Sequence, residues 1–155
     1  MLAINRGKGA VAGILALTLV TGCGGSSNNQ SSSFKRGYES TANQLKQVSH
    51  DIGVEIQQAP KQTDAQVLAA FRGLATRWQN HLSKLQTLKP PSNFAADFNT
   101  VTGAAGRVEA DLNGIVSAAG THSAAAARQA AASLVSDILT AKAASTKITG
   151  KLGSR

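Results

Sequence analysis

The sequence predicts an all-α protein: a four-helix bundle with up-down-up-down connections, behind a cleaved signal peptide and a flexible tether. Three observations support this fold class. Only 4% of the 155 residues are aromatic, alanine is abundant, and the β-branched residues form no alternating runs. Apolar residues instead recur every three or four positions in four long stretches. Proline and glycine separate these stretches by short connections, which favour antiparallel neighbours.

Residues 1–22 have the three parts of a secretory signal peptide. Arg6 and Lys8 form a positively charged region, and residues 10–20 form an apolar run. A helix that spans a membrane needs roughly twenty apolar residues, so this run is too short to stay in the bilayer by itself. Small residues then precede Cys23, as expected at a cleavage site.

The sequence Val-Thr-Gly-Cys at positions 20–23 resembles the lipobox of bacterial lipoproteins. The resemblance implies that the Cys23 thiol receives a diacylglyceryl group and that the chain is cut before this residue. Two acyl chains would hold the protein firmly on a membrane, at ~0.8 kcal/mol per buried CH₂. The expected location is the cell membrane on its extracytoplasmic side, or the outer membrane in a Gram-negative source. The alternative is an ordinary signal peptide, but Cys23 is the only cysteine and so has no disulfide partner in the chain.

Three segments therefore follow one another along the chain: the signal peptide over 1–22, the lipidated cysteine and its tether over 23–33, and the bundle over 34–155. The tether is rich in Gly, Ser and Asn, and we expect it to be a flexible coil. A coil of ten such residues spans roughly 17–19 Å. We therefore expect the bundle to stay close to the membrane while tumbling freely.

The first two helices follow from apolar stripes that end at prolines. Pro60 ends the first stripe and Pro90-Pro91 end the second. Thr63 and Gln66 have the spacing of a capping box at the start of the second helix. The stripe of the first helix is Phe34, Tyr38, Thr41 or Ala42, Leu45, Val48, Ile52 and Ile56. The stripe of the second is Val67, Phe71, Leu74, Trp78, Leu82, Leu85 and Leu88.

The third helix is expected to begin at a Ser92 cap and to end at Gly120, and the fourth to begin near residues 121–123. The stripe of the third helix is Phe94, Phe98, Val101, Ala105, Val108, Leu112 and Ile115. The stripe of the fourth is Ala127, Ala131, Leu134, Ile138, Ala141, Ile148 and Leu152. Because this last stripe is largely alanine, the fourth helix either packs very close to its neighbours or is loosely held.

The pattern Leu82-x-x-Leu85-x-x-Leu88-x-Pro90-Pro91, between two amphipathic helices and behind a lipobox, resembles small helical lipoproteins of actinobacterial type. The likeness covers most of the chain after the signal peptide. It implies a helical-bundle fold and a location in the cell envelope, but no chemistry.

No catalytic or metal-binding motif appears in the sequence, and we expect no enzyme, cofactor or metal. The chain has no Gly-x-Ser-x-Gly elbow, no glycine-rich phosphate loop and no histidine pair at ligand spacing. His50 is expected on a solvated face and His122 in a loop. His81 lies at the edge of the apolar stripe beside Trp78, so the two form a weak candidate for ligand contact in a carrier bundle. Four phenylalanines could line the same cavity, although aromatic residues at this spacing are more often plain core: Phe34, Phe71, Phe94 and Phe98.

Basic residues dominate the charge, with a formal net charge of +8 that falls to +6 when Arg6 and Lys8 leave with the signal peptide. For an exported protein, the expected counter-charge is anionic lipid or wall polymer rather than nucleic acid. The up-down order would gather seven cations at the membrane end: Lys35, Arg36, Lys84, Lys89, Lys147, Lys151 and Arg155. It would gather Asp51, Glu55 and Asp64 at the far end. Lys147, Lys151 and Arg155 are thus candidate lipid-facing residues, although cations near helix C-termini also suit the helix dipole.

These patterns predict a membrane-anchored, non-enzymatic interaction or structural module with an unknown protein partner. The alternative is a carrier bundle that holds a small hydrophobic ligand or a cofactor near His81 and Trp78.

Overall fold

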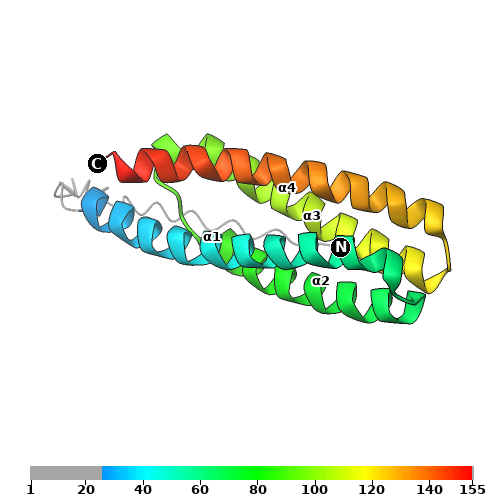
Figure 1. Ribbon diagram of the computed structural model, residues 1–155. Coiled ribbons are helices and arrows are strands. Elements are labelled where there is room, and N and C mark those ends of the chain that lie inside the picture. Colours follow the sequence, from blue (N-terminus) through cyan, green and yellow to red (C-terminus); the bar gives the residue numbers. More distant parts are fainter. Residues whose placement is uncertain (1–25, 155) are drawn as a thin grey trace, which may run out of the picture.

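The computed structural model describes residues 26–154, and these form an all-α bundle of four long helices (Figure 1). The expected signal peptide, Cys23 and Arg155 lie outside the described residues. The helices are α1 (Ser26–Gln58), α2 (Asp64–Thr87), α3 (Ala95–Gly120) and α4 (Ala124–Gly153). Two short 3-10 helices join them, η1 (Ala59–Lys61) before α2 and η2 (Ser92–Phe94) before α3.

Successive helices run in opposite directions, which confirms the up-down-up-down topology (Figure 1). We call the end where α1 and α3 begin and α2 and α4 finish the proximal pole, and the opposite end the distal pole. Contacts between helices fix their relative heights: Lys35 of α1 donates a hydrogen bond to the Leu152 carbonyl of α4, at 3.2 Å. Trp78 of α2 donates from its indole nitrogen to the Ala105 carbonyl of α3, at 2.8 Å.

The predicted apolar stripes form one continuous core along the bundle. Trp78 is 2% exposed, and its bond to Ala105 satisfies the one polar group of a large apolar side chain at the α2–α3 seam. The largest fully buried side chains come from all four helices: Trp78, Tyr38, Phe71, Phe94, Ile52, Leu85, Leu112, Leu134, Ile148, Val48 and Val108.

The helices are packed unevenly, because α4 lies mainly against α3 and only sparsely against α1. Small residues allow the close approach of α3 and α4. A Cβ added at Gly114 of α3 would lie 3.3 Å from the Ala130 Cβ of α4. The alanine-rich stripe of α4 therefore packs closely on α3, which is the first of the two outcomes predicted for this helix.

Helix α1 begins eight residues before the predicted start at Phe34. Residues 26–33, expected as flexible coil, continue the helix because no proline or glycine interrupts this stretch. Residues 29–33 bury no side chain, so the extension projects beyond the packed core. Eight residues of α-helix span about 12 Å.

The capping box predicted at the start of α2 is confirmed. The Thr63 backbone N–H donates to Gln66 Oε1 at 2.8 Å, and the Gln66 backbone N–H donates to Thr63 Oγ1 at 3.3 Å. The prediction that Ser92 caps α3 is wrong. Ser92 instead begins η2, and Phe94 stands at the N-cap of α3 without a side-chain hydrogen bond. Pro91 restricts the backbone just before this point, and the chain forms the three-residue 3-10 helix η2 before α3 begins.

Helix α3 ends at Gly120 as predicted, but the left-handed residue that stops it is His122, with a φ of 53°. The Ser123 N–H donates to the Ala118 carbonyl at 2.9 Å and the His122 N–H donates to the Ala119 carbonyl at 3.3 Å. This is the bonding of a Schellman motif. Ser123 also caps α4 by accepting from the Ala126 N–H, so one residue closes α3 and opens α4.

Candidate functional site

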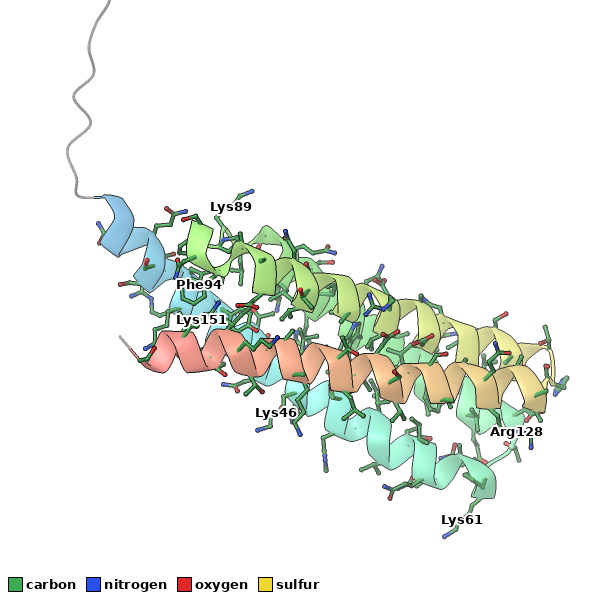
Figure 2. All side chains as sticks on the ribbon, turned by 90° about the horizontal axis from the view of Figure 1, so that it is seen from above. Lys46, Lys61, Lys89, Phe94, Arg128 and Lys151 are labelled. Carbon is green, nitrogen blue, oxygen red and sulfur yellow. The ribbon has the colours of Figure 1, made fainter. Side chains whose placement is uncertain are left out.

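Positive charge is concentrated in the proximal half of the bundle. This half, which we define as residues 26–46, 80–103 and 139–154, contains eight Lys and Arg residues and two Asp and Glu residues. The distal half of the described chain, residues 47–79 and 104–138, contains five Lys and Arg residues and six Asp and Glu residues. Figure 2 shows Lys89 and Lys151 at the proximal end and Lys61 and Arg128 at the other. The proximal cations are Lys35, Arg36, Lys46, Lys84, Lys89, Lys142, Lys147 and Lys151.

The candidate lipid-facing cations differ in whether their charges already have partners within the protein. Lys151 forms an ion pair with Asp97 of α3 at 2.5 Å, so part of its charge is neutralised within the protein. Lys35 is held by the Leu152 carbonyl. Lys147 is exposed, and Arg155 lies outside the described residues. Of Lys147 and Lys151, the two members of the predicted trio that the structure describes, Lys147 is therefore the one better suited to contact an outside anion.

An aromatic cluster lies beneath the proximal pole and joins α1 to the start of α3. The Phe34 ring centroid lies 5.6 Å from that of Tyr38, 5.5 Å from that of Phe94 and 5.7 Å from that of Phe98. All four side chains are buried. Phe71 is buried in the core but has no ring contact with this cluster among the described residues, so the four phenylalanines grouped from the sequence do not line one site. The cluster is core and fixes the proximal ends of the helices.

The three predicted far-end carboxylates lie in the distal half, and each has a partner there. Asp51 forms an ion pair with Arg77 at 2.7 Å. Glu55 accepts a hydrogen bond from the Gln62 side-chain amide at 2.6 Å. Asp64, in the first turn of α2, contacts Nδ1 of His122 in the α3–α4 turn at 2.5 Å. The distal pole is thus cross-linked by polar contacts and close to electrically balanced.

Trp78 is buried in the core, whereas His81 is only partly buried. The Trp78 indole is bonded to α3, whereas burial, with the nearby charges of Lys84 and Arg77, lowers the pKa of the His81 imidazole. Two open surface hollows lie elsewhere, one between α1 and α2 beside Val54 and Gly73, and one between α2 and α3. Neither hollow is lined by His81 or Trp78.

Protein-family models, curated proteins and solved structures were compared with the chain, and none of them matches it. Within residues 26–154, none of the helices is both long enough and apolar enough to cross a membrane. The same part of the chain brings together no three His, Cys, Asp or Glu side chains in a group that could hold a metal ion.

One cluster of ionisable residues was not identified from the sequence. Asp111 of α3 and Asp137 of α4 meet across the close α3–α4 seam, beside Arg107. Arg107 binds Asp137 at 2.8 Å. Burial, the charge of Asp137 and a hydrogen bond to it raise the pKa of Asp111, and Arg107 partly offsets this. The two residues are 26 positions apart on separate helices, so periodicity within one helix gave no signal for their contact.

Proposed function

We propose that this chain is a lipid-anchored, non-enzymatic module of the bacterial cell envelope, held on the extracytoplasmic side of a membrane through Cys23. The observation that carries the proposal is the Val-Thr-Gly-Cys sequence at positions 20–23, which ends an apolar run of signal-peptide length. Acylation there would attach the membrane three residues before the start of α1. The anchor would therefore adjoin the proximal pole.

The charge distribution supports this orientation. The half of the bundle nearest to the anchor carries eight cations against two carboxylates. Juxtamembrane cations attract anionic lipid with about 1 kcal/mol each near the surface, and acyl chains and basic residues commonly act together as two anchoring signals. If the acidic residues were instead in excess next to the anchor, that half of the bundle would repel an anionic surface.

The start of α1 supports a defined spacing from the membrane. With α1 beginning at Ser26, two residues separate Cys23 from a helix, in place of the ten-residue coil expected from composition. The packed core then begins at Phe34, about 12 Å further along the helix. A bundle anchored in this way stays close to the headgroups, as suits a module that contacts the membrane surface or another envelope component.

The first test is a mass spectrum of the chain extracted from its own membrane in mild detergent. The expected mass is that of residues 23–155 plus acyl groups. A matched Cys23→Ala variant should lose both the acyl mass and the membrane association. Recovery of an uncleaved chain without lipid would overturn the proposal. A reproducible extra mass of small-molecule size in the native spectrum would instead favour the carrier function.

A further inference from the structure

A row of exposed apolar side chains runs along the outer face of α4. Ala132, Val135, Leu139 and Ala143 follow one another at intervals of three and four residues, so they share one face of the helix. Val135 is 46% exposed and Leu139 is 59% exposed. In the described part of the chain, the only other large apolar side chain with comparable exposure is Val54 of α1. Val135 and Leu139 are too exposed to contribute to the core, so packing within the bundle does not explain why two large apolar side chains lie next to each other on the surface.

The row lies on the outer face of α4, and the neighbouring helix α1 leaves α4 along the bundle. The two helices are joined near the proximal pole, where Lys35 bonds to Leu152 and the Tyr38 hydroxyl lies 2.9 Å from Ser145 Oγ. Figure 2 shows α1 and α4 diverging from there toward the distal pole, so that Lys61 of the first connection and Arg128 of α4 lie well apart. Contacts between the two helices are correspondingly few.

Two cations of α4 share the face that carries the row. Arg128 and Lys142 are exposed, and each lies seven residues from Val135, or two turns along the same face. The one carboxylate of α4, Asp137, is 18% exposed and is bonded to Arg107 on the α3 side. The outer face of α4 therefore offers apolar and cationic groups and no free anion.

We propose that this face is a lipid-docking surface: the bundle lies along an anionic bilayer on α4, with Val135 and Leu139 entering the headgroup region. The inference rests on the proposed anchor at Cys23, which holds the chain at the membrane, and adds the face by which the chain contacts it. Amphipathic helices with apolar residues flanked by Lys and Arg bind interfaces in this way, with the apolar face buried about 5–10 Å. The cations pair with lipid phosphates.

A second copy of the chain is a poorer occupant of the face. Helix α4 carries four cations, Arg128, Lys142, Lys147 and Lys151, and its single carboxylate is already paired within the protein. Two such faces in contact would set like charges together, which disfavours association. An anionic surface supplies the missing counter-charge.

This arrangement differs measurably from one in which the bundle stands on its proximal pole. Leu139 is 14 residues from Gly153 at the end of α4, which is about 21 Å along the helix. A bundle standing upright would therefore hold Leu139 in water, well above the headgroups. Lying on α4 brings Leu139 into the interface and leaves Ser83, an exposed residue of α2, in water.

The experiment uses the full acylated chain on vesicles of phosphatidylglycerol and phosphatidylcholine, with an environment-sensitive fluorophore on Leu139→Cys. Acylation of Cys23 leaves the introduced thiol as the only free one. We expect the Leu139 label to shift to shorter wavelength and to be quenched by brominated acyl chains, and a matched Ser83→Cys label to do neither. In vesicles of phosphatidylcholine alone the Leu139 shift should be lost, although the anchor keeps the protein on the vesicle.

Charge-reversal variants provide a second test, which asks whether the cations of α4 are needed for the quenching of the Leu139 label. With the Leu139 label in place, Arg128→Glu together with Lys142→Glu should abolish the quenching and leave vesicle flotation unchanged. The matched reversal on α2, Arg72→Glu together with Lys84→Glu, should leave the quenching intact. Equal loss of quenching in the two double variants would overturn the assignment to α4.

The remaining outcomes separate failure of this inference from failure of the anchor. A protein that floats with the vesicles while its Leu139 label stays in water would overturn the docking face and leave the anchor standing. Quenching of a Lys89→Cys label instead would show that the bundle stands on its pole. Shielding of Leu139 in detergent, with the mass of two chains, would assign the face to a second copy. A chain without acyl groups that does not float would overturn the proposed function itself.

Discussion

The Tyr38 hydroxyl of α1 and the Ser145 hydroxyl of α4 lie 2.9 Å apart, and this hydrogen bond joins two adjacent helices that pack only sparsely on each other. Tyr38 is fully buried, and its burial raises the pKa of its phenol. Because a buried hydroxyl without a partner is costly, the pair acts as a unit. Removal of one partner should therefore differ from removal of both.

We expect Ser145→Ala to lower the free energy of unfolding by about 1–3 kcal/mol, because it leaves the Tyr38 hydroxyl buried without a partner. Tyr38→Phe should cost about 0.5–1.5 kcal/mol. The double variant should cost less than the sum of the two. Urea unfolding followed by circular dichroism measures all three, and strict additivity would show that the bond contributes nothing to stability.

Gly37 lies where α1 closely approaches the Leu88 side chain at the end of α2. A Cβ at this position would lie 2.8 Å from Leu88 Cδ2, whereas a Cβ at Gly103 would meet nothing within 4 Å. Gly103→Ala should therefore raise the free energy of unfolding by about 0.5–1 kcal/mol through helix propensity. Gly37→Ala should gain less than this or lose stability, because the Leu88 side chain must move. Combining Gly37→Ala with Leu88→Ala should restore the gain relative to Leu88→Ala alone, and equal effects of the two single glycine substitutions would contradict this reasoning.

Asp111 should make stability depend on pH in the direction opposite to that of an ordinary paired carboxylate. Its pKa is raised in the folded state, so the contribution of the neutral form is fully present below the unfolded pKa. That contribution is lost as the pH rises through the folded pKa. Asp111→Asn should therefore be more stable than the natural chain at neutral pH, and the difference should shrink on acidification. Thermal unfolding across pH measures this. Asp137→Asn should also weaken this pH dependence, because it removes the charge that helps to raise the pKa of Asp111.

Trp78 should be the most sensitive single position of the α2–α3 seam. Trp78→Phe removes the indole N–H bonded to the Ala105 carbonyl and leaves part of the ring volume empty. We expect a loss of about 1–3 kcal/mol in the free energy of unfolding, measured by circular dichroism because the chain has no second tryptophan. A loss no larger than that of an exposed substitution such as Gln79→Ala would show that the seam tolerates repacking.

The number, order and direction of the helices could be predicted because prolines, a capping box and apolar periodicity are all local signals. Pro60 and Pro90 end their stripes in the sequence itself, and Thr63 and Gln66 are three residues apart. The start of α1 was missed because serine and asparagine are weak helix formers, and composition alone argued for coil. Once the helix has formed after Phe34, it can extend toward the N-terminus through such residues as long as no proline or glycine interrupts it.

The features that involve two helices could not be predicted in the same way. Asp111 and Asp137 meet because of the height at which α3 packs on α4, which depends on the small residues between them. The exposed Leu139 belonged to none of the predicted stripes, so the core pattern gave no reason to single it out. The Cys23 anchor remains a prediction from motif alone.

The uneven packing of α1 also orders the events of folding. Helices α3 and α4 are adjacent in the chain and make the most extensive contact, so they need only a short loop closure to meet. Helix α1 gains its aromatic partners only when Phe94 and Phe98 are available, some 60 positions after Phe34. In a chain synthesised from its N-terminus, the first helix to emerge is therefore one whose aromatic contacts form only after most of the chain has followed it.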